Sequence, residues 1–475
     1  MSQSTQVQHL LQLLTDSVCS LNEICASNDT RIPDLNEPYH PASEAFRANP
    51  DAQRAAAIIS AAASQLQAIF SPPQVSLYHV AAGTFRSAAL RVCIEGHVTE
   101  ILREAGPEGL HVNQIAAING LDAKKLARFL RYLASLHVYT ELAPDVFANN
   151  RISSMMDTHK CPLANQKSSP ERKHENTSGF PALVSSHLDE VAKAAIYSWE
   201  AMSDPEMGHS TKNNATPLNK AFGTENLTYF GFLQDPRQSA RHQRFAVAME
   251  GVTMFQPDLF AQAYDWKSLP AGSVVVDVGG GVGTVSLALA EEFPDINIVV
   301  QDLPSIVEKG HKVWSTRQPE ALKSGRVVLQ AHDFFTEQPQ KDASVFLVKH
   351  VLHNWSDEDC QKMLSRLRDA ARPDTKLLVL EIIMPYVCHQ DTQGKKSVIP
   401  GATPREAPKP LLANFGSVNE FAYVLDMLVF SLCNSEERTI DQFDELFRKS
   451  GWKLTKVHRV SEDLSMWQSI EAVPA

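Results

Sequence analysis

The sequence predicts an α/β protein: a doubly wound, Rossmann-like parallel sheet preceded by a helical, winged-helix-like domain. From Ser273 onward, apolar runs alternate with helical stretches, as in SVVVDVGGG, INIVVQDL, GRVVLQAHDFF, ASVFLVKHVL and KLLVLEIIMP. Runs that are apolar along their whole length are typical of parallel strands covered on both faces. Upstream, the stretch from about Leu77 to Ser154 is compact and helical.

The helical stretch contains a helix-turn-helix pattern. In HVNQIAAINGLDAKKLARFLRYLASLHVYTEL, one helix ends at Gly120, Asp122 caps the next, and a short strand follows where a wing would lie. The second helix carries four basic residues: Lys124, Lys125, Arg128 and Arg131. Solvated side chains on an amphipathic helix explain these residues better than DNA binding, because the chain has only one such unit and is acidic overall.

The composition describes a large acidic globular chain. It has 475 residues, 43% of them hydrophobic, and 44 Lys and Arg against 55 Asp and Glu give a formal net charge of −11. This balance excludes a basic footprint over the whole surface, so we expect no nucleic-acid partner. The seven cysteines form no CxxC pair, which argues against a zinc site or a disulfide framework. No signal peptide or long apolar run is present, so we expect a cytoplasmic protein without a membrane partner.

These patterns divide the chain into five segments, the last of which carries a surface insertion. Breaker-rich stretches such as DTHKCPLANQKSSPERKHENTSGF mark the boundaries between segments. In order, we expect an N-terminal helical appendage (1–72), the winged-helix-like domain (73–160), a linker (161–180), a helical lid over the substrate (181–265) and the α/β domain (266–475, with the insertion at 386–412).

The most informative segment is VVVDVGGGVGTVSLALAEEF, in which a strand passes through a glycine turn into a helix. Glycines at 279, 281 and 283 let a ligand approach the backbone, and the helix N-terminus directs amides toward it. A nicotinamide dinucleotide requires G-x-G-x-x-G, but Thr284 stands where the third glycine would fall. Asp277, just before the turn, would also repel a pyrophosphate.

Two carboxylates favour a different ligand. Asp277 suits a ligand that carries an ammonium and a sulfonium group. Asp302 ends the next strand, where a ribose diol would lie. Together with the glycine turn, these acids predict S-adenosylmethionine. The alternative is a glycine-rich turn that serves packing alone.

The segment KHVLHNWSDEDC follows the fourth strand, and its position places Lys349, His350 and His353 near the cofactor. A neutral histidine with a pKa of about 6.5 can take a proton from a phenol with a pKa of about 10. Glu381 and Glu437 are placed to hydrogen-bond the far ring nitrogen and to stabilise the imidazolium. We therefore assign the base to His353 and interpret His350 as a packed or capping side chain.

A metal site is the alternative interpretation of this segment. His350 and His353 with Asp357 and Glu358 offer an i, i+3 histidine pair but no clear third ligand. We therefore expect no metal.

Taken in order and spacing, DVGGGVG, VQDLP, AHDFF, KHVLHNWSDEDC, LEIIMP and EERT resemble the S-adenosylmethionine-dependent O-methyltransferases of the caffeate or plant-phenol type. The resemblance spans residues 77–470 and is greatest to fungal members that act on aromatic natural products. It implies methyl transfer to a phenolic hydroxyl of a small aromatic acceptor, with His353 as general base and without a metal. It also implies that the winged-helix-like domain joins two copies into a homodimer.

The resemblance further implies individual roles in binding the two substrates. Residues implied for the cofactor, from the methionine end to the adenine, are Asp277, Gly279, Gly281, Gly283, Asp302, Leu303, Asp333 and Phe334, with Lys349 as a further contact. Residues implied for the acceptor pocket are Phe245, Met249, Met427 and Phe430. Two features depart from the family pattern: Asn354 replaces the Asp that often follows the base, and segments 1–72 and 386–412 are longer than in the plant enzymes.

Two other functions remain open at this point. One is a winged-helix regulator that uses a degenerate methyltransferase fold as a ligand sensor, and the other is a metal-dependent catechol methyltransferase. The intact acids and base argue against the regulator, and the effect of EDTA on activity separates the metal-dependent enzyme. The sequence does not specify which phenol is the acceptor.

Overall fold

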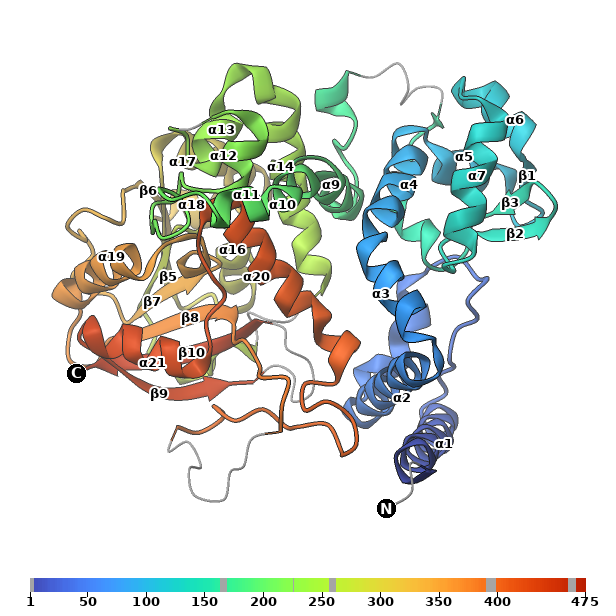
Figure 1. Ribbon diagram of the computed structural model, residues 1–475. Helices are drawn as coiled ribbons and strands as arrows, with labels where there is room; N and C mark the ends of the chain where they lie inside the picture. Colours follow the sequence, from blue (N-terminus) through green and yellow to red (C-terminus); the bar gives the residue numbers. More distant parts are fainter. Residues whose placement is uncertain (1–3, 163–168, 225, 256–261, 390–398, 460–466) are drawn as a thin grey trace. The chain divides into compact units, whose positions relative to one another are not determined.

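The computed structural model describes residues 4–162, 169–224, 226–255, 262–389, 399–459 and 467–475 (Figure 1). The chain divides into two compact units, each built from two stretches of sequence. The helical unit comprises Met1–Ala201 and Pro217–Phe255, and the sheet unit comprises Met202–Thr216 and Gln256–Ala475. Parts of the predicted linker (163–168) and of the predicted insertion (390–398) lie outside the described residues.

The sheet unit is built on seven strands in the order β6-β5-β4-β7-β8-β10-β9. The first five strands are parallel, as the sequence predicts, and β10 runs antiparallel to both β8 and β9. The two antiparallel strands were not predicted. The strands are β4 (Val274–Val278), β5 (Asn297–Asp302), β6 (Val327–Ala331), β7 (Val345–Lys349), β8 (Lys376–Ile382), β9 (Trp452–His458) and β10 (Trp467–Pro474).

Helices alternate with these strands and cover the sheet (Figure 1). Helix α19 shows how the sequence starts one of them: the Ser356 side chain accepts from the amide of Asp359, and three acids occupy the first turn. The helices of the sheet unit are η7 (Trp266–Ser268), α16 (Thr284–Glu292), α17 (Pro304–Arg317), α18 (Pro319–Lys323), η8 (Leu352–Asn354), α19 (Asp357–Ala370), η9 (Gly416–Asn419), α20 (Glu420–Cys433) and α21 (Ile440–Lys449).

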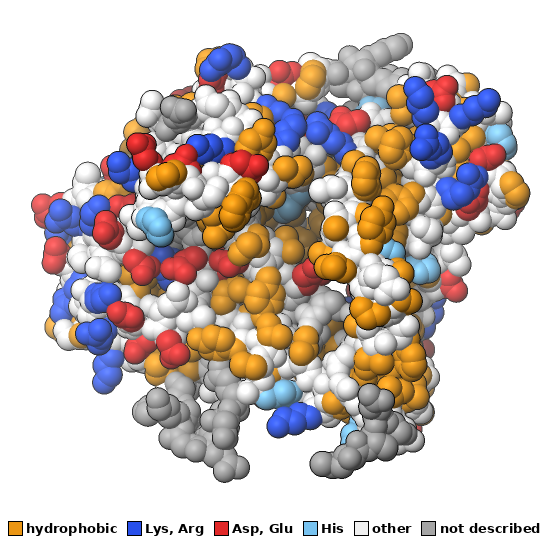
Figure 2. Space-filling model, viewed as in Figure 1, with side chains coloured by type: hydrophobic (Ala, Val, Ile, Leu, Met, Phe, Trp, Pro, Cys, Tyr) orange, Lys and Arg blue, Asp and Glu red, His pale blue; other side chains and the backbone are white. Residues whose placement is uncertain are grey.

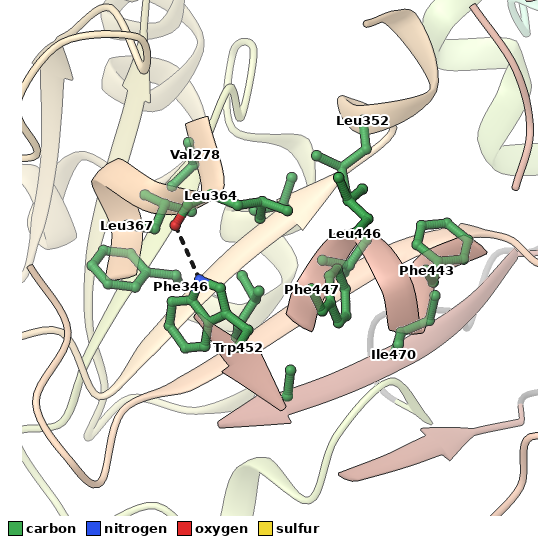
Figure 3. Close-up of a cluster of buried hydrophobic side chains, with 14 of the residues drawn as sticks. Val278, Phe346, Leu352, Leu364, Leu367, Phe443, Leu446, Phe447, Trp452 and Ile470 are labelled. Atoms are coloured by element: carbon green, nitrogen blue, oxygen red, sulfur yellow. Dashed lines mark hydrogen bonds between the residues drawn. The ribbon is translucent and has the colours of Figure 1, made fainter. Parts of the chain in front are cut away.

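The main core of the sheet unit lies where α19 and α21 pack on the sheet. Figure 3 shows Phe346 of β7, Leu364 and Leu367 of α19, and Phe447 of α21 among its side chains. Trp452 of β9 is buried there, and its Nε1 donates to the carbonyl of Leu364 at 3.0 Å. This core fixes strands β7 and β8, whose carboxyl ends carry the predicted base and one of its acids.

The first part of the helical unit contains the predicted helix-turn-helix and its wing. Gly120 adopts φ 76° between α6 and α7, and the Asp122 side chain accepts from the amide of Lys125 at 2.9 Å. Arg131 of α7 pairs with Glu141 and Asp145 of the wing, so this basic residue serves the fold. The elements are α1 (Ser4–Ser27), η1 (Pro41–Ala48), α2 (Pro50–Phe70), α3 (Pro73–Ala81), α4 (Gly83–Glu95), α5 (Val98–Ala105), β1 (Leu110–His111), α6 (Val112–Asn119), α7 (Ala123–Ala134), β2 (Thr140–Ala143), β3 (Val146–Ala148) and η2 (Ser153–Met156).

The N-terminal segment before α2 is bound to this winged-helix part. The amide of Arg151 donates to the carbonyl of Leu35 at 3.0 Å, and its guanidinium donates to Ser43 Oγ at 2.8 Å. The amide of Tyr39 donates to Ser154 Oγ at 2.7 Å. These contacts tie residues far apart in sequence, so the appendage forms one body with the winged helix.

A second helical group follows. Glu190 is buried and pairs with Arg244 of α14, while Asp189 pairs with both Arg241 and Arg244. Most of the predicted lid region falls in this unit, except 202–216 and the residues after 255. The elements are η3 (Pro170–Arg172), α9 (Phe180–Ser186), η4 (His187–Val191), α10 (Ala192–Ile196), α11 (Ser198–Met202), α12 (Pro217–Phe222), α13 (Tyr229–Gln234), η5 (Pro236–Gln238), α14 (Ser239–Val252) and η6 (Thr253–Phe255).

The distribution of charge and the length of the apolar helices bear on the predicted absence of nucleic-acid and membrane partners. Positive and negative side chains are intermingled over the face shown in Figure 2. Within the described residues, Gly416–Cys433 has the length and hydropathy of a membrane span, and α2 with α3 reaches them only as a pair bent by 115°. The first of these stretches contains helix α20, in which Val429 and Leu432 are buried in the sheet unit, and a third of the stretch is buried in all.

Candidate active site

The glycine turn joins β4 to α16 and leaves open space above one of its residues. Gly279, Gly281 and Gly283 adopt φ values of 67°, 62° and 85°, which side chains with a Cβ rarely adopt. A Cβ on Gly283 would lie 2.6 Å from Trp314 Nε1, whereas a Cβ on Gly281 would meet nothing within 4 Å. Packing against Trp314 therefore explains why residue 283 is glycine. The space above Gly281 remains available to a ligand.

Asp277 lies beneath this turn and not on its open side. Its side chain is buried, Ser286 Oγ donates to its Oδ2 at 2.6 Å, and a Cβ on Gly280 would lie 2.6 Å from its Cγ. Burial raises the pKa of Asp277 to about 6, against the Ser286 hydrogen bond and the positive charge of Lys349. The carboxyl thus supports the turn from within the fold, and its predicted contact with the methionine part stays a prediction.

Asp302 connects the ends of two neighbouring strands. Its Oδ2 accepts from the amide of Gly281 at 2.8 Å and its Oδ1 from the amide of Leu303 at 2.7 Å. Burial raises the pKa of this half-buried carboxyl, and the two amide hydrogen bonds oppose that change. A carboxylate has about four acceptor sites, so both oxygens can still accept from hydroxyl groups. The side chain of Leu303 is exposed beside it.

The predicted adenine residues follow β6. Asp333 is exposed and accepts from the amide of Phe335 at 3.0 Å. The ring of Phe334 stands edge-on to those of Phe335 and Trp355, with centroid distances of 4.8 and 5.8 Å. A Cβ on Gly279 would lie 3.7 Å from Phe334, so the structure brings this ring beside the glycine turn.

A buried glutamine network supports the same loop and was not predicted. Gln301 and Gln338 exchange amide hydrogen bonds at 2.8 and 2.9 Å, and both are almost fully buried. Gln301 also donates to Gln330, its register partner on β6, at 2.8 Å. The partners come from separate strands and a loop, so only the pairing of β5 with β6 could have revealed the network.

The three predicted catalytic residues meet in a buried cluster at the ends of β7 and β8. His353 Nδ1 lies 2.6 Å from Glu437 Oε1 and 3.6 Å from Glu381 Oε2. Glu381 Oε1 accepts from the amides of Val351 and Leu352, each at 2.9 Å. With Nδ1 held by a carboxylate, Nε2 is the ring atom of His353 that can exchange a proton with a ligand.

The electrostatics of this cluster differ from those of a free imidazole. Burial alone would lower the pKa of His353, but the charges of Glu381 and Glu437 and the hydrogen bond to Glu437 outweigh burial and raise that pKa to about 9. Burial raises the pKa of Glu381, while the positive charge of His353 opposes that rise. The pKa of His353 therefore lies above the value of about 6.5 for an ordinary imidazole.

The segment that carries His353 is anchored by Arg438 and Asn354, for which the sequence analysis predicted no such contacts. Arg438 is buried, and its guanidinium donates to the carbonyls of Leu352 and Trp355 at 3.0 and 2.9 Å. Asn354, the departure from the family pattern, donates to the carbonyl of His350 at 3.1 Å. The EERT motif contains Arg438, but the motif alone does not reveal which backbone its side chain binds.

A second anchor holds the segment 202–216 on the sheet unit. Asn434, which ends α20 with φ 52°, donates through its side chain to the carbonyls of Ser210 and Lys212 at 2.7 and 3.1 Å. Ser435 donates to the carbonyl of Trp355 at 2.8 Å. The end of α20 therefore joins this segment to the one that carries His353.

The acids near His353 are not those of the metal site considered from sequence. Asp357 accepts from Arg438 at 2.9 Å, and Glu358 is exposed. Among the described residues, the ligand atoms of His353, Glu381 and Glu437 lie within 4.8 Å of one another.

The residues predicted for the acceptor pocket lie on two helices. Met427 and Phe430 lie on α20, with Met427 exposed, whereas Phe245 and Met249 lie on α14 of the helical unit.

Comparison with known proteins identifies the family of the chain. Residues 78–158 match the O-methyltransferase dimerisation domain, and residues 199–401 match the O-methyltransferase domain. The chain is 47% identical to 4-O-methyltransferase 1 of Phanerochaete chrysosporium, over 99% of each chain. This similarity shows an enzyme and not the regulator considered above.

Solved structures share the fold at low sequence identity. The mitomycin 7-O-methyltransferase MmcR superposes with a TM-score of 0.61 and 23% identity, over 85% of this chain and 98% of that one. LepI in complex with S-adenosylmethionine gives a TM-score of 0.66 and 17% identity, over 89% and 95%. The dimerisation domain indicates a homodimer, and the family acts on small-molecule acceptors. The chain thus belongs to the O-methyltransferase family and uses S-adenosylmethionine as its methyl donor.

Proposed function

We propose that this enzyme methylates a phenolic hydroxyl of a small aromatic acceptor, with Nε2 of His353 as the general base. The observation that carries the proposal is the hydrogen bond of 2.6 Å between His353 Nδ1 and Glu437 Oε1, beside the buried carboxylate of Glu381. A carboxylate on Nδ1 fixes the ring tautomer and stabilises the imidazolium that forms when Nε2 takes the proton.

The residues around the glycine turn fit S-adenosylmethionine. Open space lies above Gly281, and the carboxylate of Asp302 retains acceptor sites for the two ribose hydroxyls. The exposed Asp333 and the half-buried Phe334 are proposed to contact the adenine, and Lys349 is proposed for a further polar contact. When bound, the cofactor supplies an electrophilic sulfonium methyl group. Asp277 is proposed for the methionine part, and it also supports the turn through its hydrogen bond with Ser286.

The basicity of His353 supports a phenol over an aliphatic alcohol. A base with a pKa of about 9 lies close to a phenol of pKa about 10. It lies far below a hydroxyl as weakly acidic as water, which has a pKa near 16. The base is therefore nearly matched to a phenol.

An acceptor wall is proposed on α20 of the sheet unit. Helix α20 stands beside the base, because Asp426 accepts from the amide of Glu437 at 2.8 Å. Met427 and Phe430, on the same helix, are therefore proposed to contact the aromatic ring. Phe245 and Met249 are kept as proposed walls from the family resemblance.

The cytoplasmic location and the absence of nucleic-acid and membrane partners stay predictions from composition.

The test is a His353→Ala variant assayed with labelled S-adenosylmethionine and a panel of phenols. We expect kcat to fall by about 10²–10⁴-fold, as for loss of a general base, while calorimetry gives an unchanged Kd for S-adenosylhomocysteine. His311→Ala, which removes an exposed histidine on α17, is the matched control. A near-normal kcat in the His353 variant would overturn the assignment.

A metal-dependent methyltransferase is the second candidate, because two carboxylate oxygens next to His353 have no hydrogen-bond partner within the described part of the chain. These atoms are Oε2 of Glu381 and Oε2 of Glu437. Dialysis against EDTA followed by Mg²⁺ or Zn²⁺ separates the two mechanisms. Unchanged turnover after EDTA supports the histidine base, and a loss restored by either cation supports the metal.

A further inference from the structure

His350 adopts a backbone conformation that is unusual for its residue type. Its φ is +54°, in the left-handed region that disfavours residues with a Cβ. Such conformations persist where the surrounding structure imposes them, and they cluster at functional sites. Two hydrogen bonds hold it: its amide donates to the carbonyl of Leu380 at 3.2 Å, and its carbonyl accepts from Asn354 at 3.1 Å.

The turn at His350 directs three successive amides at one carboxylate oxygen. The amides of Val351, Leu352 and His353 lie 2.9, 2.9 and 3.4 Å from Glu381 Oε1. Successive amides that converge after a left-handed residue form an anion-binding concavity. This amide nest holds Glu381 so that its other oxygen lies 3.6 Å from His353 Nδ1.

The side chain of His350 has a separate partner. Its Nδ1 lies 3.2 Å from the ammonium nitrogen of Lys349. An ammonium group only donates, so Nδ1 accepts and the imidazole is neutral, with its proton on Nε2. The ring also stacks on Trp467, with a centroid distance of 4.7 Å and an interplanar angle of 39°. A ring fixed in this way fixes the direction of the lysine.

We propose that His350 is a positioning residue with two separable roles. Its left-handed backbone shapes the amide nest that holds Glu381, and its imidazole orients the Lys349 ammonium toward the cofactor. The inference rests on the proposed function, since it takes His353 as the base and Lys349 as a cofactor contact. The sequence analysis interpreted this residue as packing or capping only.

Two substitutions separate the roles. His350→Gly removes the imidazole but adopts the left-handed conformation without a Cβ clash, whereas His350→Ala removes the imidazole and also disfavours that conformation. His350→Asn is the conservative variant, because asparagine tolerates the left-handed region and its side-chain oxygen can accept from Lys349. All three are made in the full-length enzyme.

The role of the imidazole is tested by calorimetry, which measures the Kd for S-adenosylhomocysteine. We expect its Kd to rise about tenfold in His350→Gly, which corresponds to about 1.4 kcal/mol, and to return toward the wild-type value in His350→Asn. In a Lys349→Met background, His350→Gly should cause no further rise, because the coupling between the two side chains is already lost. An unchanged Kd in His350→Gly, or an equal rise in both backgrounds, would overturn this role.

The role of the His350 backbone is tested by the pH dependence of kcat. His353 is faced by Glu381 of β8, by Glu437 and Arg438 after α20, and by His350 itself. We expect His350→Gly to keep the wild-type profile. In His350→Ala, a loosened Glu381 supports less positive charge on His353, so the acid limb should move to lower pH. Identical profiles for the Gly and Ala variants would overturn this role.

The calorimetric comparison measures cofactor binding and requires no turnover. It therefore tests the role of the His350 imidazole even if a group other than His353 is the base. If His353→Ala retains near-normal turnover, the proposed function fails while the Kd comparison still decides whether His350 orients Lys349. Conversely, an inactive His353→Ala with an unchanged Kd in His350→Gly overturns only the role of the His350 imidazole.

Discussion

Replacing Glu437 by glutamine is expected to move the acid limb of the pH profile of kcat to lower pH. In the wild-type enzyme, His353 must lose its proton before Nε2 can act as a base, so activity rises with pH through the pKa of His353. Glu437 contacts Nδ1 directly, at 2.6 Å. Removing its negative charge destabilises the imidazolium, so the proton leaves at lower pH.

The size of the change follows from the two carboxylates. They raise the pKa of His353 from 6.5 to about 9, against burial. An opposite charge within about 4–6 Å shifts a pKa by about 1–3 units, and Glu381 remains in the variant. We therefore expect a fall of about 1–2 units, to a pKa of about 7–8. At pH 7 the neutral fraction rises from about 1% to about 10–50%.

The plateau at high pH should fall by at least about tenfold at the same time. A less basic imidazole is a weaker proton acceptor. A glutamine amide can also donate to Nδ1, which places the ring proton on Nε2, where it blocks the base. The variant is thus slower at its optimum but loses activity at a lower pH than the wild type.

The assay measures kcat from pH 6 to 10.5 with two phenols of different acidity. A limb that moves with the acidity of the phenol belongs to the acceptor, and a limb that moves only in Glu437→Gln belongs to His353. Glu436→Gln is the matched control, because Glu436 accepts from Gln442 at 2.9 Å. An acid limb at the same pH in the wild type and in Glu437→Gln would refute the reasoning.

Three further predictions concern the cofactor site and the core. Asp302→Asn should raise the Kd for S-adenosylhomocysteine by about 10–100-fold, since hydrogen bonds to a charged group contribute about 1.5–3 kcal/mol; an unchanged calorimetric Kd would count against the ribose role. Trp452→Phe removes the hydrogen bond to the Leu364 carbonyl, so the free energy of unfolding in urea should fall by about 1–3 kcal/mol. Gly283→Ala should lower stability and cofactor affinity more than Gly272→Ala, because both positions have positive φ but only the former meets a side chain, Trp314; equal effects would contradict this reading.

The sequence was informative where chemistry coincides with the end of an apolar strand. Strands β4, β5, β7 and β8 are continuous apolar runs, so Asp302, Lys349 and Glu381 could be placed at one edge of the sheet. Strand β9 alternates buried and exposed residues, a weaker signal, and it was not predicted.

Orientation and electrostatics required the three-dimensional structure. The sequence did not show that Asp277 lies beneath the turn, because the side on which a strand's last side chains lie depends on the packing of α16. The pKa of His353 depends on carboxylates that are 28 and 84 residues away along the chain. The left-handed backbone of His350 could not be predicted, because residue type does not reveal a backbone angle.

The anchoring of segment 202–216 by Asn434 has a consequence for how the chain can fold and be divided. Its two hydrogen bonds span 224 and 222 residues of sequence, although the segment is flanked on both sides by the helical unit. During synthesis from the N-terminus, Asn434 is made only after nearly the whole chain, so segment 202–216 cannot form these hydrogen bonds earlier. Contacts between residues this far apart in sequence form late and slowly, because a long loop must close first. A truncated chain that begins after residue 255 would leave the Asn434 amide without these two acceptors. The sheet unit therefore includes a segment that the chain supplies before Pro217, and a fragment that lacks this segment lacks part of the unit.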